Sequence, residues 1–226
     1  MIGTFNLLIY QPTGLKKEPL ISKQTTVEAL IFDLGGVLID IDFEQVFKRW
    51  VKLSELTISE IRQRFSMDEA YKKHERGEFN AEQYFSYLRE LLHLKANDGE
   101  IARGWNSIFF GEIPATMDYI YSAKAHLPCY AFTNSNPTHQ ASWGAAYPNV
   151  VQAFDQIFVS SDMGLRKPEP AAFSAISTAI GVRLEGMLFF DDTVENIVAA
   201  QAMGIQTVLV KQPSDIKQAL ISREIL

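Results

Sequence analysis

The sequence has one cysteine, no long apolar run and no dense cluster of basic residues. Cys129 alone cannot form an intramolecular disulfide, and the amino terminus does not read as a signal peptide with a cleavage site, so we expect a reducing, cytoplasmic setting. Asp, Gly or Lys interrupts every apolar stretch before the ~18 residues that a membrane span requires, which excludes the membrane as a solvent. No histidine pair has the HExxH spacing of a zinc site.

The charge balance excludes a second class of partner. The chain has 21 Lys and Arg against 27 Asp and Glu, a net charge of −6, so it lacks the basic footprint of a nucleic-acid-binding protein. We therefore expect a small-molecule partner, no nucleic acid and no membrane, and the sequence leaves the oligomeric state open. With 226 residues, of which 47% are hydrophobic, the chain is long enough for one large domain or for a core with an inserted subdomain.

The pattern of apolar residues divides the chain into segments. Residues 1–26 lack a sustained period and are interpreted as an extension of uncertain order. The run VEALIFDLGG predicts a strand over 28–33, buried on both faces, with Asp33 at its carboxyl end. Residues 43–110 carry apolar side chains at helical spacing and are expected to be helical and poor in strands.

After Pro114 the pattern alternates regularly. Apolar runs at CYAFTN, QIFVS, MLFFDD and QTVLV predict strands, each followed by a helical stretch. The expected helices cover about 114–126, 137–146, 170–180, 194–203 and the carboxyl terminus. This alternation predicts an α/β fold with a doubly wound parallel sheet, a Rossmann-like core over 27–44 and 112–226 that is interrupted by a helical subdomain over 45–111.

Polar residues follow the predicted strands where open α/β sheets bind their ligands, at the carboxyl ends. They are Asp33, Thr133, Asn134, Lys167, Asp191 and Asp192. Together they offer a carboxylate nucleophile, oxygen ligands for a hard cation, a hydroxyl and an amide for phosphate oxygens, and a lysine that neutralises charge. These are the groups that phosphoryl transfer through an acyl phosphate requires.

Each signal also has a structural interpretation when it is taken alone. Asp33 can close a turn, and the Thr133–Asn134 pair can cap the helix that follows it. Lys167 can be a solvated loop residue. The adjacent carboxylates 191–192 are harder to explain structurally, because they repel each other unless a cation or a helix amino terminus compensates them.

Four segments in this order resemble the motifs of the haloacid dehalogenase superfamily of hydrolases. They are FDLGGVLID, AFTNSN, GLRKPEPAAF and LFFDDTVENIVAAQAMG, and the resemblance covers about residues 28–212. Within the superfamily, DLGGVLIDIDF, GWNSIFFGEIP, TNSNPTHQ and FFDDTVEN are most similar to the branch that contains the bacterial α-D-glucose-1-phosphate phosphatase.

The resemblance implies a magnesium-dependent phosphatase that acts on small metabolites, most of all sugar phosphates. Asp33 would attack phosphorus and form an aspartyl phosphate that water hydrolyses. Mg²⁺ would be held by Asp33, the Gly35 backbone carbonyl and Asp192, with Asp191 as a ligand or as support for the ligands.

The same resemblance assigns the phosphate-binding groups and the subdomain. Thr133 and the Asn134 backbone would donate hydrogen bonds to the phosphoryl group, and Lys167 would offset its charge. Residues 45–111 would form a helical cap that closes over the site and excludes water.

One position departs from the family pattern. Phosphatases of the family usually carry a second aspartate, a general acid and base, two residues after the nucleophile, and here that residue is Gly35. Its loss affects poor leaving groups most, whereas a sugar 1-phosphate leaves through a more acidic anomeric oxygen. Asp40, Asp42 and His139 are candidate replacements.

In the cap, the candidate sugar contacts are Glu75, Trp105 and Asn106, although an aromatic-rich helical block is more often core than contact surface.

Two alternative functions stay open. A metal-independent 2-haloacid dehalogenase would use the same strand-end aspartate, but it gains nothing from the acidic pair 191–192. A non-catalytic phospholigand-binding protein would have no need to retain both Asp33 and Lys167. Fold alone does not decide between these functions.

Overall fold

The computed structural model describes residues 26–226, so the extension predicted at 1–26 lies outside the described part except for Thr26. Five parallel strands form one sheet in the order β5-β4-β1-β6-β7. The strands are β1 (Ala29–Phe32), β4 (Cys129–Thr133), β5 (Gln156–Val159), β6 (Met187–Asp191) and β7 (Gln206–Leu209). β1 is central, with β4 and β5 added on one side of it and β6 and β7 on the other. The order of the strands therefore reverses at β1.

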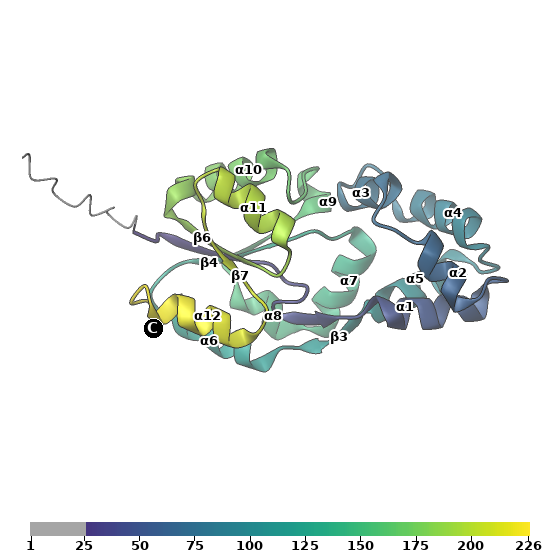
Figure 1. The fold of residues 1–226 in the computed structure, drawn as a ribbon, viewed down its shortest axis with the longest axis horizontal. Helices are drawn as coiled ribbons and strands as arrows, with labels where there is room; N and C mark the ends of the chain where they lie inside the picture. Colours follow the sequence, from purple (N-terminus) through teal and green to yellow (C-terminus); the bar gives the residue numbers. More distant parts are fainter. Residues whose placement is uncertain (1–25) are drawn as a thin grey trace, which may run out of the picture.

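Helices cover both faces of this sheet, which confirms the predicted doubly wound α/β fold. In Figure 1, α10 and α11 lie above the sheet and α6, α8 and α12 lie below it. The helices of this part are α6 (Pro114–Lys124), α7 (Pro137–Ala146), α8 (Pro148–Ala153), α9 (Ser160–Met163), α10 (Pro170–Ile180), α11 (Val194–Ala202), α12 (Pro213–Ile221) and the 3-10 turn η3 (Leu184–Gly186).

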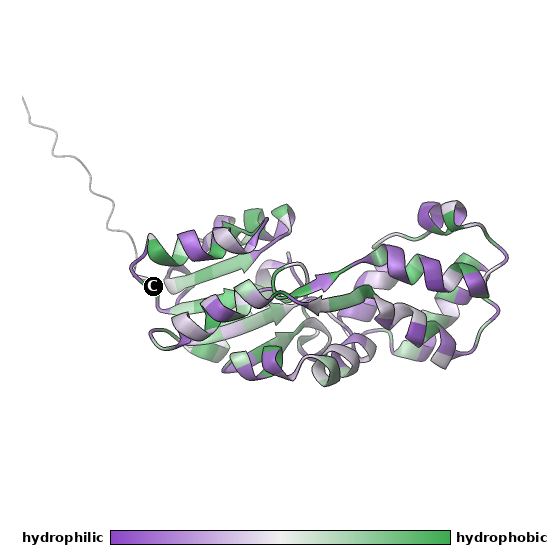
Figure 2. Ribbon diagram, turned by 90° about the horizontal axis from the view of Figure 1, so that it is seen from below, coloured by the Kyte–Doolittle hydropathy of each residue, from purple (hydrophilic) through white to green (hydrophobic). Residues whose placement is uncertain are grey.

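Alternating side chains of β1 explain the two layers. Leu30 and Phe32 pack with one set of helices, whereas Ala29 and Ile31 pack with the other, and all four are buried. A strand that is apolar on both faces is typical of a parallel sheet covered by helices. Figure 2 shows the sheet strands in green beneath helices that mix green and purple.

The segment Phe43–Ile108 forms a second body with its own core, which we call the helical lobe. Its buried centre holds Trp50 stacked on Trp105, with ring centroids 5.5 Å apart. Gly104 makes this stack fit, because a Cβ there would lie 2.5 Å from the Trp50 ring. The lobe contains α1 (Phe43–Trp50), η1 (Val51–Leu53), α2 (Ile58–Arg64), α3 (Glu69–Glu75), α4 (Ala81–Leu92), α5 (Asp98–Trp105) and η2 (Asn106–Ile108).

A two-stranded ribbon, absent from the sequence-based expectation, joins the helical lobe to the sheet. The strands β2 (Ile39–Ile41) and β3 (Phe109–Glu112) pair antiparallel, so both chain crossings between the two bodies run through one ribbon. A three-residue strand with two exposed residues has too little alternation to be detected in the sequence. Within residues 26–226, no helix has the length and hydropathy needed to cross a membrane.

The helical lobe also touches the sheet body at the end of α3. The Glu75 carboxylate lies 2.8 Å from Arg166 Nε, and Arg76 lies 3.4 Å from Glu169. Next to them, Gly77 has a positive φ of 71°, and a Cβ there would lie 2.5 Å from a backbone oxygen of the sheet body. The lobe is therefore held closed over the strand ends at two places, the ribbon and the end of α3.

Candidate active site

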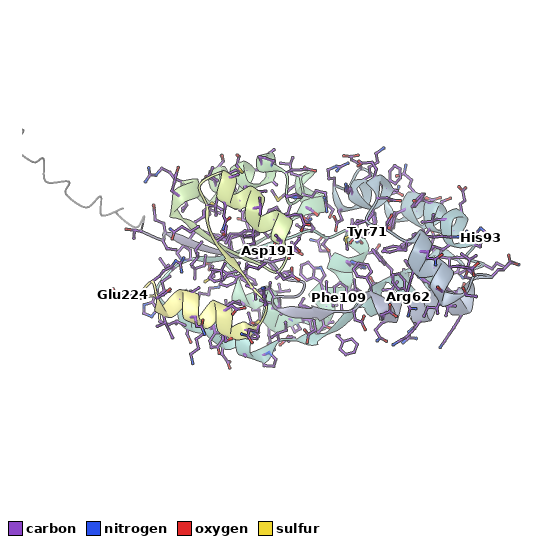
Figure 3. The ribbon with its side chains drawn as sticks, in the orientation of Figure 1. Arg62, Tyr71, His93, Phe109, Asp191 and Glu224 are labelled. Carbon is purple, nitrogen blue, oxygen red and sulfur yellow. The ribbon has the colours of Figure 1, made fainter. Side chains whose placement is uncertain are left out.

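A cavity of about 640 Å³ lies between the two bodies, at the carboxyl ends of the central strands. Figure 3 labels the two sides, with Asp191 at the end of β6 and Tyr71 on α3. The predicted site residues that line the cavity are Asp33, Gly35, Thr133, Asn134, Lys167 and Asp192. The structure thus brings together groups that come from four separate places in the sequence.

Lys167 connects the acidic residues of the site. Its side chain is 1% exposed, so the interpretation as a solvated loop lysine is wrong. The ammonium lies 2.8 Å from Asp33 Oδ1 and donates hydrogen bonds to Asp191 Oδ2 at 2.7 Å and to the Phe132 carbonyl at 2.9 Å. Burial alone would lower the pKa of Lys167, but the charges of Asp191 and Asp33 outweigh burial and raise it. Lys167 therefore stays protonated.

The side chain of Asn134 fixes the loop that carries this lysine. Its Nδ2 donates to the Lys167 carbonyl at 3.0 Å, and its Oδ1 accepts from the Lys167 backbone N–H at 2.8 Å. This reciprocal pair leaves the Asn134 side chain occupied. Within residues 26–226, the Thr133 hydroxyl donates no hydrogen bond, although Thr133 lines the cavity. A free hydroxyl at the strand end is suited to a phosphate oxygen.

Asp33 presents one occupied and one free carboxylate oxygen. Oδ1 lies near Lys167 and accepts from the Leu34 backbone N–H at 2.7 Å, whereas Oδ2 accepts no hydrogen bond from any described residue. Burial raises the pKa of Asp33 to about 7 against the lowering effect of Lys167, and the charges of Asp191 and Asp192 add to the rise. A bound cation would lower the pKa of Asp33 again and keep its carboxylate ionised.

The two adjacent aspartates have different surroundings. Asp191 is fully buried, and both of its oxygens accept hydrogen bonds from Lys167, Asn196 or the Thr193 backbone N–H. Asp192 lines the cavity, and burial together with the charge of Asp191 raises its pKa. Sequence analysis missed Asn196, which comes four to five residues after the pair, at the spacing of one helical turn.

The residues present fit a hard divalent cation. One carboxylate oxygen from each of Asp33, Asp191 and Asp192 lies within 4.8 Å of the others. Gly36 has a positive φ of 72°, and a Cβ on it would lie 2.2 Å from Asp192 Oδ2, so the Asp192 carboxylate rests directly against the glycine backbone. A cluster of oxygen donors without sulfur or imidazole is the set that Mg²⁺ prefers.

An apolar side chain crowds the place of the missing acid. A Cβ on Gly35 would lie 3.2 Å from Ile41 Cδ1, so a second aspartate there would require this ribbon side chain to shift by a few tenths of an ångström. Of the candidate replacements, Asp42 accepts from Glu44 and Gln45 as the helix cap of α1, and Asp40 does not line the cavity.

His139, the third candidate, lines the cavity but is a poor acid. Burial lowers its pKa to about 3, and its Nε2 lies 3.3 Å from the Trp105 carbonyl, to which it donates. The imidazole is therefore neutral at physiological pH.

Of the three candidate sugar contacts in the helical lobe, only Glu75 lines the cavity. Trp105 is fully buried in the core of the lobe and Asn106 does not line the cavity, so the expectation for these two is wrong in this structure. Glu75 does line it, together with Tyr71 and Lys72 of the same helix, which sequence analysis missed. Their spacing along one face of α3 was the available signal.

Comparisons with known proteins agree with this geometry. A family model for haloacid dehalogenase-like hydrolases matches residues 27–204. The chain is 24% identical over 201 residues to a D-ribitol-5-phosphate phosphatase of Bacteroides thetaiotaomicron, with 86% of this chain and 97% of that protein covered. It is also 24% identical over 205 residues to a phosphatase of Mycobacterium tuberculosis, with 87% and 93% covered.

A solved structure extends the comparison. The crystal structure of a haloacid dehalogenase family enzyme from Bacteroides thetaiotaomicron, in complex with magnesium and inorganic phosphate, matches with a TM-score of 0.73 at 27% identity. The match covers 82% of this chain and 94% of that one.

Proposed function

Since the chain belongs to the haloacid dehalogenase-like hydrolases and is a phosphomonoester hydrolase, we propose that it hydrolyses small phosphorylated metabolites, in particular sugar phosphates, with Mg²⁺ as cofactor. The observation that carries the proposal is the free Oδ2 of Asp33, beside the buried Lys167 and the carboxylate of Asp192. The identity of one relative as a ribitol phosphate phosphatase supports a polyol or sugar substrate.

The reaction begins with Asp33. Its free carboxylate oxygen attacks phosphorus in line with the ester oxygen, a new O–P bond forms, and the ester O–P bond breaks. The departing oxygen takes its proton from water in the cavity or from a residue not yet assigned. Water then attacks the phosphorus of the aspartyl phosphate, which releases inorganic phosphate and restores the Asp33 carboxylate.

The surrounding residues hold the phosphoryl group and its charge. Thr133 and the Asn134 backbone N–H donate hydrogen bonds to phosphoryl oxygens, and Lys167 neutralises charge on the nucleophile and phosphate together. Asp33, the Gly35 carbonyl and Asp192 would hold the cation, which supplies positive charge to the phosphoryl oxygens. The hydrogen bonds that occupy both oxygens of Asp191 favour support of Lys167 over direct ligation.

The helical lobe, which largely coincides with the proposed cap at 45–111, acts as the lid that excludes water and contacts the leaving group. Absence of a general acid at Gly35 favours substrates with acidic leaving groups, which include sugar 1-phosphates as in the glucose-1-phosphate phosphatase branch. A metal-independent dehalogenase would leave Asp192 as an uncompensated carboxylate in the cavity. The cytoplasmic location stays a prediction.

The test is hydrolysis of p-nitrophenyl phosphate and a panel of sugar and polyol phosphates, with Mg²⁺ and with a chelator. Asp33→Asn is the matched control, because it keeps the shape of the side chain and removes the nucleophile. We expect phosphate release only by the unmodified chain with Mg²⁺. Full activity of Asp33→Asn would refute the mechanism, and equal activity with the chelator would refute the role of the metal.

A further inference from the structure

Arg166 reaches across the cavity from the sheet body to the helical lobe. Its Nε donates to Glu75 Oε2 at 2.8 Å, and the Glu75 carboxylate, 5% exposed, also forms a hydrogen bond with Tyr71. Within residues 26–226, neither Nη nitrogen of Arg166 donates a hydrogen bond, although Arg166 lines the cavity. The guanidinium is thus fixed at one nitrogen and unpartnered at its two outer ones.

Lys72 lies on the same side of the cavity. It is three residues before Glu75 on α3, so both side chains share one face of that helix. Lys72 lines the cavity and is half-buried, and its ammonium forms no ion pair or hydrogen bond in the part of the chain that the structure describes. Two cationic side chains therefore face the cavity with free donors.

These donors have different partners from those of the phosphoryl site. The Lys167 ammonium points to Asp33 and Asp191, whereas the Arg166 side chain extends to Glu75 on the helical lobe. Two glutamates also line the cavity. Glu75 is already paired with Arg166, and Glu195 comes three residues after Asp192 of the phosphoryl site. A cavity of about 640 Å³ has room for a metabolite that extends from one set of donors to the other.

We propose that Lys72 and Arg166 form a second anion subsite, which binds a carboxylate or a second phosphate at the end of the substrate opposite the scissile phosphate. A guanidinium with two free outer nitrogens matches the planar, bidentate geometry of either anion, and the nearby ammonium adds a point charge. The inference rests on the proposed phosphatase function and narrows its substrates to phosphorylated sugar acids or bisphosphates. Glu75 positions Arg166 and does not itself need to touch the substrate.

The experiment compares matched ligands as competitors of p-nitrophenyl phosphate hydrolysis by the full chain with Mg²⁺. 6-Phosphogluconate and sorbitol 6-phosphate share a six-carbon chain and a phosphate, and differ by a carboxylate against a hydroxymethyl group. Fructose 1,6-bisphosphate and fructose 6-phosphate form the second pair, which tests a phosphate in place of the carboxylate. In at least one pair, we expect the compound with two anionic groups to have an inhibition constant lower than that of its partner by about ten-fold or more.

Three variants assign the effect to the subsite. Lys72→Met and Arg166→Met should each reduce the preference by about ten-fold. Lys72→Met keeps the test decisive if Arg166→Met, which leaves Glu75 buried without its partner, fails to fold. Lys73→Met is the matched control, because Lys73 is the next residue of α3, has the same charge and does not line the cavity. It should retain the preference.

The outcomes separate the two proposals. Hydrolysis of p-nitrophenyl phosphate with equal inhibition constants in both pairs overturns the subsite alone. A preference that persists in Lys72→Met, or that falls equally in Lys73→Met, also overturns it, because the effect would then follow the overall charge. No hydrolysis of p-nitrophenyl phosphate by the unmodified chain overturns the proposed function and the subsite with it.

Discussion

Replacing Gly35 by aspartate restores a carboxyl group at the position where related phosphatases carry their general acid. The backbone tolerates the change, because Gly35, unlike Gly36, does not have a positive φ. The new Cβ would lie 3.2 Å from Ile41 Cδ1, so this methyl group must retreat by a few tenths of an ångström. Ile41 is 40% exposed and has space in which to move.

The expected gain in rate from a general acid exceeds the cost of displacing Ile41. A strained rotamer of Ile41 costs about 1 kcal/mol, whereas a well-placed general acid is worth at least about 100-fold, or about 2.7 kcal/mol. The benefit falls on the poorer leaving group, since a good one departs without a proton. We therefore expect Gly35→Asp to raise kcat/KM for phenyl phosphate relative to p-nitrophenyl phosphate by about ten-fold or more.

The assay is initial-rate hydrolysis of the two aryl phosphates with Mg²⁺, where kcat/KM reports departure of the leaving group. Gly35→Asn is the matched control, since it has the same size without an acidic proton. The double variant Gly35→Asp with Ile41→Ala removes the close contact and should show at least the same gain. If Gly35→Asp and Gly35→Asn give the same ratio of rates, the account of the glycine is wrong.

Four further predictions concern the metal, a buried ion pair, the closure of the lobe and pH. Asp192→Asn should raise the Mg²⁺ concentration for half-maximal activity by about ten-fold or more, whereas Asp191→Asn should lower the free energy of unfolding by about 3 kcal/mol, measured by chemical denaturation, because it breaks a buried ion pair. Gly77→Ala should destabilise the protein more than Gly181→Ala. Both glycines have a positive φ near 70°, but only at Gly77 would the Cβ meet a backbone oxygen; equal losses would contradict close docking. Burial lowers the pKa of His139 to about 3, so the unfolded chain takes up a proton first on acidification. Between about pH 6.5 and 3, His139 should therefore reduce stability by about 1.4 kcal/mol per pH unit, and His139→Gln should make the fall in melting temperature with acid shallower.

The regular part of the fold was predictable because its signals are local. Strands buried on both faces read as short apolar runs, and proline marks the start of α6, α7, α10 and α12 at the position where it fits a helix. The predicted segments after Pro114 accordingly agree with the structure to within about two residues. The short α8 and the ribbon of β2 and β3 carry weaker signals and were missed.

The site residues could be picked out in the sequence, but their contacts could not. Lys167 contacts Asp33, which precedes it by more than a hundred residues in the sequence. No local sequence pattern encodes such a contact. The same holds for Arg166, whose partner Glu75 comes from the other body. Trp105 looked like a contact residue because an aromatic side chain gives the same signal whether it packs in a core or lines a cavity.

The ribbon of β2 and β3 also bears on how such a chain can change over evolutionary time. Because Ile41 and Phe109 are register partners, the polypeptide leaves and re-enters the sheet body at adjacent points. An insert whose two ends are neighbours can be shortened, lengthened or exchanged for another without moving the strands on either side. Substrate choice can therefore diversify by replacement of the insert, while the carboxylates at the strand ends stay in place.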